Sequence, residues 1–145
     1  MTDTDRYETL ESLRLRAGRN PRLKEADCEI LDAGGGKLVL TVMPPASAIN
    51  GNGSGTVHGG FLFSVCDTAC AFACMSQSDG GVTQSAHITY VRPGKEGERL
   101  RVEAHEVART RRSQTFDAKI LTPRGETVAI FRGIFQLIEK KAAKG

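Results

Sequence analysis

The chain has 145 residues, 39% of them hydrophobic, which is long enough to build one core and one domain. Three of its 20 basic side chains lie in the tail (Lys140, Lys141 and Lys144), so the other 17 balance the 17 acidic ones and the tail accounts for the formal charge of +3. A balanced domain argues against nucleic acid as the main partner. No basic segment followed by an apolar one opens the chain, so we expect no signal peptide and a cytoplasmic protein.

The N-terminal segment, residues 1–24, is predicted to be helical. Between residues 5 and 17 the apolar side chains recur at helical spacing, and Asn20-Pro21 then interrupts the pattern. We expect residues 25–139 to form the main domain and residues 140–145 to be a disordered basic tail.

Residues 28–42, CEILDAGGGKLVLTV, have the pattern of a β-hairpin, in which the glycines at 34–36 form the turn. Pro44-Pro45 ends the hairpin. Residues 46–57 then form a long polar turn, because two Asn-Gly pairs, Asn50-Gly51 and Asn52-Gly53, are typical of turns.

Residues 52–77 are predicted to join a glycine-rich turn to one long helix that is apolar on nearly every side, and the only charged side chain from Gly59 to Ser78 is Asp67. On a helical wheel of about 100° per residue, one apolar stripe consists of Phe61, Leu62, Val65, Ala69 and Phe72. The stretch falls short of the roughly 20 apolar residues that cross a bilayer, and it holds a carboxylate. We therefore predict a buried central helix rather than a membrane span.

Three of the four cysteines recur every four residues along this helix. Cys66 and Cys74 would lie about 12 Å apart along its axis, too far apart to share one metal ion. We therefore expect buried, reduced side chains and no metal site, and the same holds for Cys28.

After Gly80-Gly81 the apolar residues alternate with period two in four segments, residues 82–91, 100–108, 115–121 and 127–138. We expect these four strands to form an antiparallel meander. The predicted fold class is α+β, with an antiparallel β-sheet wrapped around one long central helix.

Five blocks, in order, carry a resemblance to a known family: N-G-S-G-T-V-H-G-G at 52–60, L-F-S-V-C-D-T-A at 62–69, A-C-M-S-Q at 73–77, Y-V-R-P-G at 90–94 and V-A-I-F-R-G at 128–133. The chain resembles the hotdog-fold thioesterases of the phenylacetate-degradation (PaaI) type. The resemblance implies hydrolysis of acyl-CoA thioesters, with phenylacetyl-CoA or ring-hydroxylated phenylacetyl-CoA favoured. It also implies a homodimer or a homotetramer built as a dimer of dimers, with no cofactor and no metal, since coenzyme A is part of the substrate.

By resemblance, the family's catalytic carboxylate corresponds to Asp67 and its carbonyl-polarising backbone amide to Gly59. Its supporting asparagine corresponds to Asn52, and a hydroxyl that some relatives use to hold water corresponds to Thr83. His58 is a candidate general acid, an orienting residue or a cap at the helix start.

The chemistry of these residues fits thioester hydrolysis. A helix N-terminus carries unpaired N–H groups and about half a positive charge, which suits a developing oxyanion. Gly59 and Gly60 place no side chain there, so a ligand can approach the backbone closely. Asp67 is either the general base or a nucleophile that forms an anhydride.

Gly59 and Asp67 are eight residues apart on one helix, about 12 Å along its axis, yet both must approach one reacting carbonyl. Two antiparallel helices across a two-fold axis would place Gly59 of one chain beside Asp67 of the other. We therefore expect Asp67 to work with Gly59 and Asn52 of the partner subunit.

Basic loops are expected to meet the phosphates of coenzyme A. The candidates lie at strand ends and turns: Arg92, Lys95, Arg109, Arg111 and Arg112. Other readings stay open, in which Asp67 is a structural acid satisfied by Ser64 or Thr68 and Asn52 is only a turn residue.

Two other functions stay open. A hotdog enoyl-thioester hydratase or dehydratase pairs a histidine with a carboxylate, as His58 and Asp67 do, although no proline-rich stretch follows His58 here. A non-catalytic acyl-CoA sensor is expected to carry an output domain and to lack the carboxylate. Release of free thiol from an acyl-CoA separates hydrolysis from both.

Overall fold

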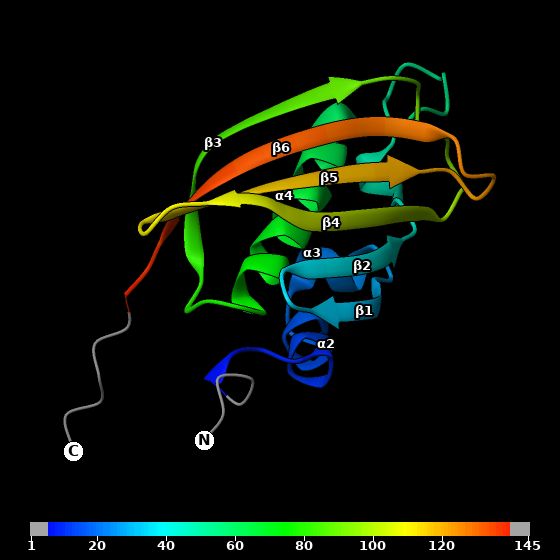
Figure 1. The fold of residues 1–145 in the computed structure, drawn as a ribbon. Helices are drawn as coiled ribbons and strands as arrows, with labels where there is room; N and C mark the ends of the chain where they lie inside the picture. The colour runs from blue at the N-terminus through cyan, green and yellow to red at the C-terminus, as the bar shows by residue number, and fades with distance from the viewer. Residues whose placement is uncertain (1–5, 140–145) are drawn as a thin grey trace.

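The computed structural model describes residues 6–139, so the predicted tail at residues 140–145 lies outside the described residues. Its elements are α2 (Leu10–Gly18), α3 (Pro21–Glu25), β1 (Glu29–Gly34), β2 (Lys37–Val42), the 3₁₀ helix η1 (Ala46–Ala48), α4 (Gly59–Met75), β3 (Gly81–Tyr90), β4 (Leu100–Arg109), β5 (Ser113–Leu121) and β6 (Thr127–Leu137). One antiparallel sheet curves around α4, with α2 and α3 near β1 and β2 (Figure 1). This is the predicted hotdog architecture.

The strand order is β1-β2-β4-β5-β6-β3, which corrects part of the sequence prediction. The consecutive strands β4, β5 and β6 form the expected meander, but β3 pairs with β6 at the far edge and not with β4. The connection between β3 and β4, residues 91–99, is longer than the two to five residues, roughly, of a hairpin loop. It leads from the β3 edge, beyond β6 and β5, to β4, which lies between β2 and β5.

The core lies between α4 and the concave face of the sheet. Helix α4 is 17 residues long, about 25 Å, and buries one stripe of side chains: Leu62, Val65, Cys66, Ala69, Cys70, Phe72, Ala73 and Cys74. Helix α4 ends at Met75, shortly before the end of the predicted stretch, and the hydroxyls of Ser76 and Ser78 donate to the carbonyls of Ala73 and Cys74 just beyond the last turn. The described helices are all too short or too polar to span a membrane.

The cysteines of α4 are packed inside the core as predicted. Burial raises the pKa of the Cys66 thiol to about 12. Cys28 was predicted to be buried but is only partly so, and this partial burial raises its pKa to about 11. The Cys74 thiol donates to Gln114 Oε1 at 3.2 Å. Within residues 6–139 no cluster of His, Cys, Asp and Glu side chains is arranged to hold a metal ion.

Between residues 7 and 25 the chain forms two helices, α2 and α3, where one was predicted. Helix α2 begins after Thr9, whose side chain caps it in a reciprocal pair with Ser12. The Asn20-Pro21 pair, which we interpreted as a break, also starts α3: the Asn20 side chain accepts from two backbone amides and Pro21 occupies the first turn. Leu13 and Leu23 bury this segment against the main core.

Candidate active site

The N-terminus of α4 is held in one orientation by two side chains. His58 caps the helix, as predicted: its Nδ1 accepts from the amide of Gly60 at 2.9 Å. The Tyr90 hydroxyl donates to the Gly59 carbonyl at 2.8 Å, so the peptide between the two glycines is fixed from both sides. Among residues 6–139 we find no acceptor for the amide of Gly59. This N–H is the free donor at the positive end of the helix.

Only glycine fits at positions 59 and 60, because Tyr90 and His58 lie too close for a side chain. A Cβ built on Gly59 would lie 2.9 Å from Cζ and Oη of Tyr90, and one built on Gly60 would lie 2.9 Å from Nδ1 of His58. Any side chain would therefore collide with the residues that orient the turn. The accepting Nδ1 also places the proton of a neutral His58 ring on Nε2.

The carboxylate of Asp67 lies two turns further along α4 and is partly buried. Thr83 of β3 donates from Oγ1 to Asp67 Oδ1 at 2.7 Å. Strict alternation along β3 would turn Thr83 to the outer face, but a β-bulge between Thr83 and Ser85 turns it toward the helix. The hydroxyl that satisfies the acid thus comes from Thr83 on another element, and not from Ser64 or Thr68.

The two asparagines of the glycine-rich turn are distinguished by their hydrogen bonds. The Asn50 amide group is used, since its Nδ2 donates to Thr56 Oγ1 at 2.9 Å. Asn52 uses only its oxygen, which accepts from the amide and the hydroxyl of Ser54 at 3.0 and 2.6 Å. The Nδ2 group of Asn52 has no acceptor among the described residues, so it is the one available to a ligand or a partner.

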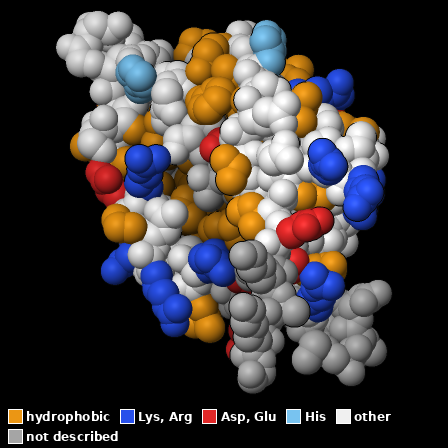
Figure 2. Space-filling model, turned by 90° about the vertical axis from the view of Figure 1, so that its left-hand side faces the viewer, with side chains coloured by type: hydrophobic (Ala, Val, Ile, Leu, Met, Phe, Trp, Pro, Cys, Tyr) orange, Lys and Arg blue, Asp and Glu red, His pale blue; other side chains and the backbone are white. Residues whose placement is uncertain are grey.

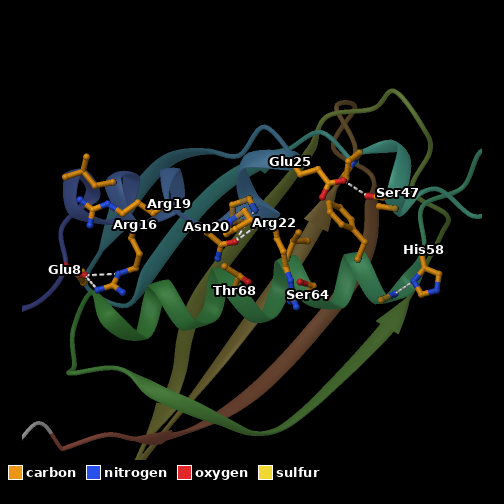
Figure 3. A pocket seen from close by; sticks show the side chains of 18 of the residues that line it. Glu8, Arg16, Arg19, Asn20, Arg22, Glu25, Ser47, His58, Ser64 and Thr68 are labelled. Carbon is orange, nitrogen blue, oxygen red and sulfur yellow. Dashed lines mark hydrogen bonds and ion pairs between the residues drawn. The ribbon is translucent and has the colours of Figure 1, made fainter.

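A groove of about 1100 Å³ lies between α4 and the helices α2 and α3, along the face of α4 that is turned toward these two helices (Figure 3). His58 and Gly60 line one end, and Arg16 and Arg19 line the other. Gly59, Asp67, Thr83 and Asn52 do not line it. One protomer therefore does not gather all the predicted catalytic residues, and Gly59 and Asp67 stay about 12 Å apart along the axis.

The predicted phosphate-binding residues are in several different places. Arg92 is engaged, because it bonds Glu126 at 2.6 Å and the Thr127 carbonyl at 2.8 Å. Lys95 lies in the loop that forms a backbone bridge with Thr56. The role of Arg92 and Lys95 in binding the phosphates of coenzyme A remains a prediction.

The remaining basic candidates are near the C-terminal end of α4. Arg109 makes a bidentate pair with Glu106, and Arg111 and Arg112 form the exposed turn between β4 and β5. The groove arginines Arg16, Arg19 and Arg22 were not among the residues predicted from the sequence. Their only signal was the recurrence of arginine through residues 14–22.

Comparison with known proteins identifies the family. The family model "Thioesterase superfamily" matches residues 54–129. The chain is 36% identical over 110 residues to "Acyl-coenzyme A thioesterase PaaI" of Escherichia coli (strain K12), a match that covers 76% of this chain and 77% of that protein. The structure of the E. coli PaaI protein superposes with a TM-score of 0.82 at 30% identity, covering 90% of this chain and 94% of that one.

A second solved relative was determined with its ligand. The hypothetical thioesterase protein of Streptococcus pneumoniae TIGR4 with coenzyme A has a TM-score of 0.76 at 25% identity, over 83% of this chain and 93% of that one. These matches agree with the geometry described above. The chain has a free amide at the start of the central helix, a carboxylate two turns later and this sheet topology. The chain belongs to the thioesterase superfamily and is a hotdog-fold thioester hydrolase.

Proposed function

We propose that this protein hydrolyses aryl-acyl-CoA thioesters, phenylacetyl-CoA or its ring-hydroxylated forms, in phenylacetic acid degradation in the cytoplasm. The similar E. coli protein is an acyl-coenzyme A thioesterase from a phenylacetic acid degradation operon. The observation that carries the proposal is the unpaired Gly59 amide together with the oriented carboxylate of Asp67. These are the two groups that thioester hydrolysis needs.

Two variants of a similar protein support the role of the Asp67–Thr83 pair. The S. pneumoniae thioesterase was solved with an aspartate changed to alanine and, separately, with a threonine changed to alanine. Those two positions are sixteen residues apart, the same separation as Asp67 and Thr83 here. The spacing fits an aspartate on the central helix and a threonine on the strand that follows.

The proposed reaction follows from these groups. The thioester carbonyl oxygen accepts from the Gly59 amide, so the negative charge that develops on it meets the positive end of α4. As general base, Asp67 takes a proton from water while the water oxygen bonds to the carbonyl carbon. The C–S bond then breaks, and the leaving thiolate takes up a proton. In the nucleophilic route Asp67 forms an anhydride and water cleaves it.

We propose that the working site lies between two subunits. Two of the residues that orient it, Thr83 and Tyr90, are on β3, which is an edge strand of the sheet. A long exposed edge is a template for pairing with another chain. Pairing of β3 with the same strand of a second copy would set the two α4 helices antiparallel and bring Gly59 of one chain toward Asp67 of the other.

Exposed apolar side chains support self-association. On β3, Val82 is 61% and Tyr90 is 49% exposed. The face drawn in Figure 2 has hydrophobic side chains near its middle, with lysine and arginine side chains scattered around them. We propose a homodimer with two composite sites, and a homotetramer in which two such dimers associate.

The test is release of free thiol from four substrates: phenylacetyl-CoA, a ring-hydroxylated phenylacetyl-CoA, benzoyl-CoA and hexanoyl-CoA. Wild type should turn over the aryl-acetyl substrates fastest, and Asp67→Asn should lose nearly all of that turnover while still binding coenzyme A. A folded wild type that binds coenzyme A but releases no thiol would refute the proposal. Consumption of an enoyl-CoA without thiol release would instead identify a hydratase.

A further inference from the structure

The groove along α4 is larger than the acyl group requires. Its volume of about 1100 Å³ exceeds the roughly 300–1,000 Å³ of ordinary small-molecule pockets. Its lining starts at the helix N-terminus with His58 and Gly60, the residues before and after Gly59, and follows α4 as far as Thr68, about 12 Å along the axis. A ligand whose reacting carbonyl is at the Gly59 amide can therefore extend along this groove.

The groove is mixed in character. Apolar side chains from α4 form part of its lining, among them Phe61 and Val65, while hydroxyls from three different elements interrupt the apolar surface: Ser12, Ser47, Ser64 and Thr68. An aryl group fills only a short apolar part of such a groove, whereas a long, amide-rich flexible chain can use both its apolar surface and its hydrogen-bonding groups.

The wall formed by the N-terminal segment carries three arginines and two glutamates, so its net charge is positive. Arg16 is paired with Glu8, but the guanidinium groups of Arg19 and Arg22 make no hydrogen bond or ion pair with any described residue. The other acid of the lining, Glu25, already accepts from Ser47 at 2.6 Å. Figure 3 shows Arg19 and Arg22 on the α2 and α3 side of the groove, above α4.

A CoA thioester has two arms that leave the carbonyl in different directions. One is the acyl group; the other carries amides, a hydroxyl and, at its far end, a diphosphate and a 3′-phosphate. Unpaired guanidinium groups bind phosphate through charge-assisted, often bidentate hydrogen bonds. We propose that the groove between α4 and helices α2 and α3 holds the coenzyme A arm of the substrate, and that Arg19 and Arg22 bind its phosphates.

This assignment rests on the proposed function, because it needs the thioester carbonyl at Gly59. In this assignment Arg19 and Arg22 are the main phosphate contacts, in place of the loop candidates such as Arg92, whose guanidinium is engaged by Glu126. The groove's upper wall comes from residues 8–48, which lie outside the part matched by the family model, residues 54–129.

The first experiment measures binding of free coenzyme A by calorimetry, without turnover. Arg19→Gln and Arg22→Gln should each weaken the Kd about tenfold, as expected for one lost charged hydrogen bond. Neither should change binding of pantetheine, which lacks the phosphates. Lys24→Gln removes the same charge from α3, but Lys24 does not line the groove, so its Kd should match wild type.

The second experiment compares hydrolysis of phenylacetyl-CoA with that of phenylacetyl-pantetheine. The double variant Arg19→Gln/Arg22→Gln should raise KM for the CoA thioester, leave kcat unchanged and leave the pantetheine thioester unaffected. An unchanged Kd for coenzyme A in the double variant overturns the proposal. So does an equal rise of KM for both thioesters, which would place the acyl group in the groove. Failure of the proposed function would appear only in turnover, not in the binding of free coenzyme A.

Discussion

The hydrogen bond from Thr83 to Asp67 provides the sharpest test of the proposed site. Thr83→Val keeps the shape of the side chain and removes only the donor that lies 2.7 Å from Asp67 Oδ1. A hydrogen bond to a charged group is worth about 1.5–3 kcal/mol, and each 1.36 kcal/mol is tenfold in rate. If Thr83 orients the catalytic carboxylate, kcat for phenylacetyl-CoA should fall about ten- to hundredfold with little change in KM.

Two further variants separate this role from a merely structural one. Thr83→Ser restores the donor and should recover most of kcat. In the double variant Thr83→Val/Asp67→Asn, the loss should be no larger than in Asp67→Asn alone, because the hydroxyl acts only through the carboxylate. A Thr83→Val enzyme with wild-type kcat, or losses that simply add in the double variant, would refute the reasoning.

Three more predictions follow from the described contacts. Gly59→Ala should lower kcat/KM by about two orders of magnitude without unfolding the protein, because the new Cβ lies 2.9 Å from the Tyr90 ring and displaces the helix start. Steady-state kinetics measures the loss of kcat/KM, and a thermal melt checks that the variant is folded. Mixed dimers of Asp67→Asn chains with Asn52→Ala chains should recover one working site, and mixtures as inactive as both parents would exclude the composite site. Folding stability should fall as pH rises above about 9, because the unfolded chain loses the Cys66 proton there while the native state keeps it up to about 12. Melts at pH 8 and 10 should therefore differ more in wild type than in Cys66→Ala.

The central helix and its carboxylate were predictable because their signals are local. An apolar run with one acid indicates a buried helix, and the two glycines after His58 mark its start. The place of β3 was not predictable from alternation, because a period of two identifies the faces of a strand but not its neighbours. The length of the connection at residues 91–99 was the available signal against a hairpin.

The groove was not predictable, because it exists only once α2 and α3 pack over α4. Its arginines come from one short segment of the chain, and nothing in their spacing indicates that they face a helix some 40 residues later. The start of α3 at the Asn20-Pro21 pair was not predictable from the sequence either. Asparagine and proline end one helix and begin the next, and only the capping hydrogen bonds distinguish the two uses.

The bulge in β3 connects the sheet to the proposed chemistry. Beyond it, Ala86 and Ile88 pack toward the core and Tyr90 reaches Gly59, so an unbroken alternation would leave Thr83 on the outer face. Because Thr83 pairs with Phe135 and Ser85 with Ile134, Gln84 is the extra residue that restores the inward orientation. One strand thus places Tyr90 at the carbonyl-binding amide and Thr83 at the carboxylate. The same strand has a free edge, so pairing with a second copy would complete two sites at once.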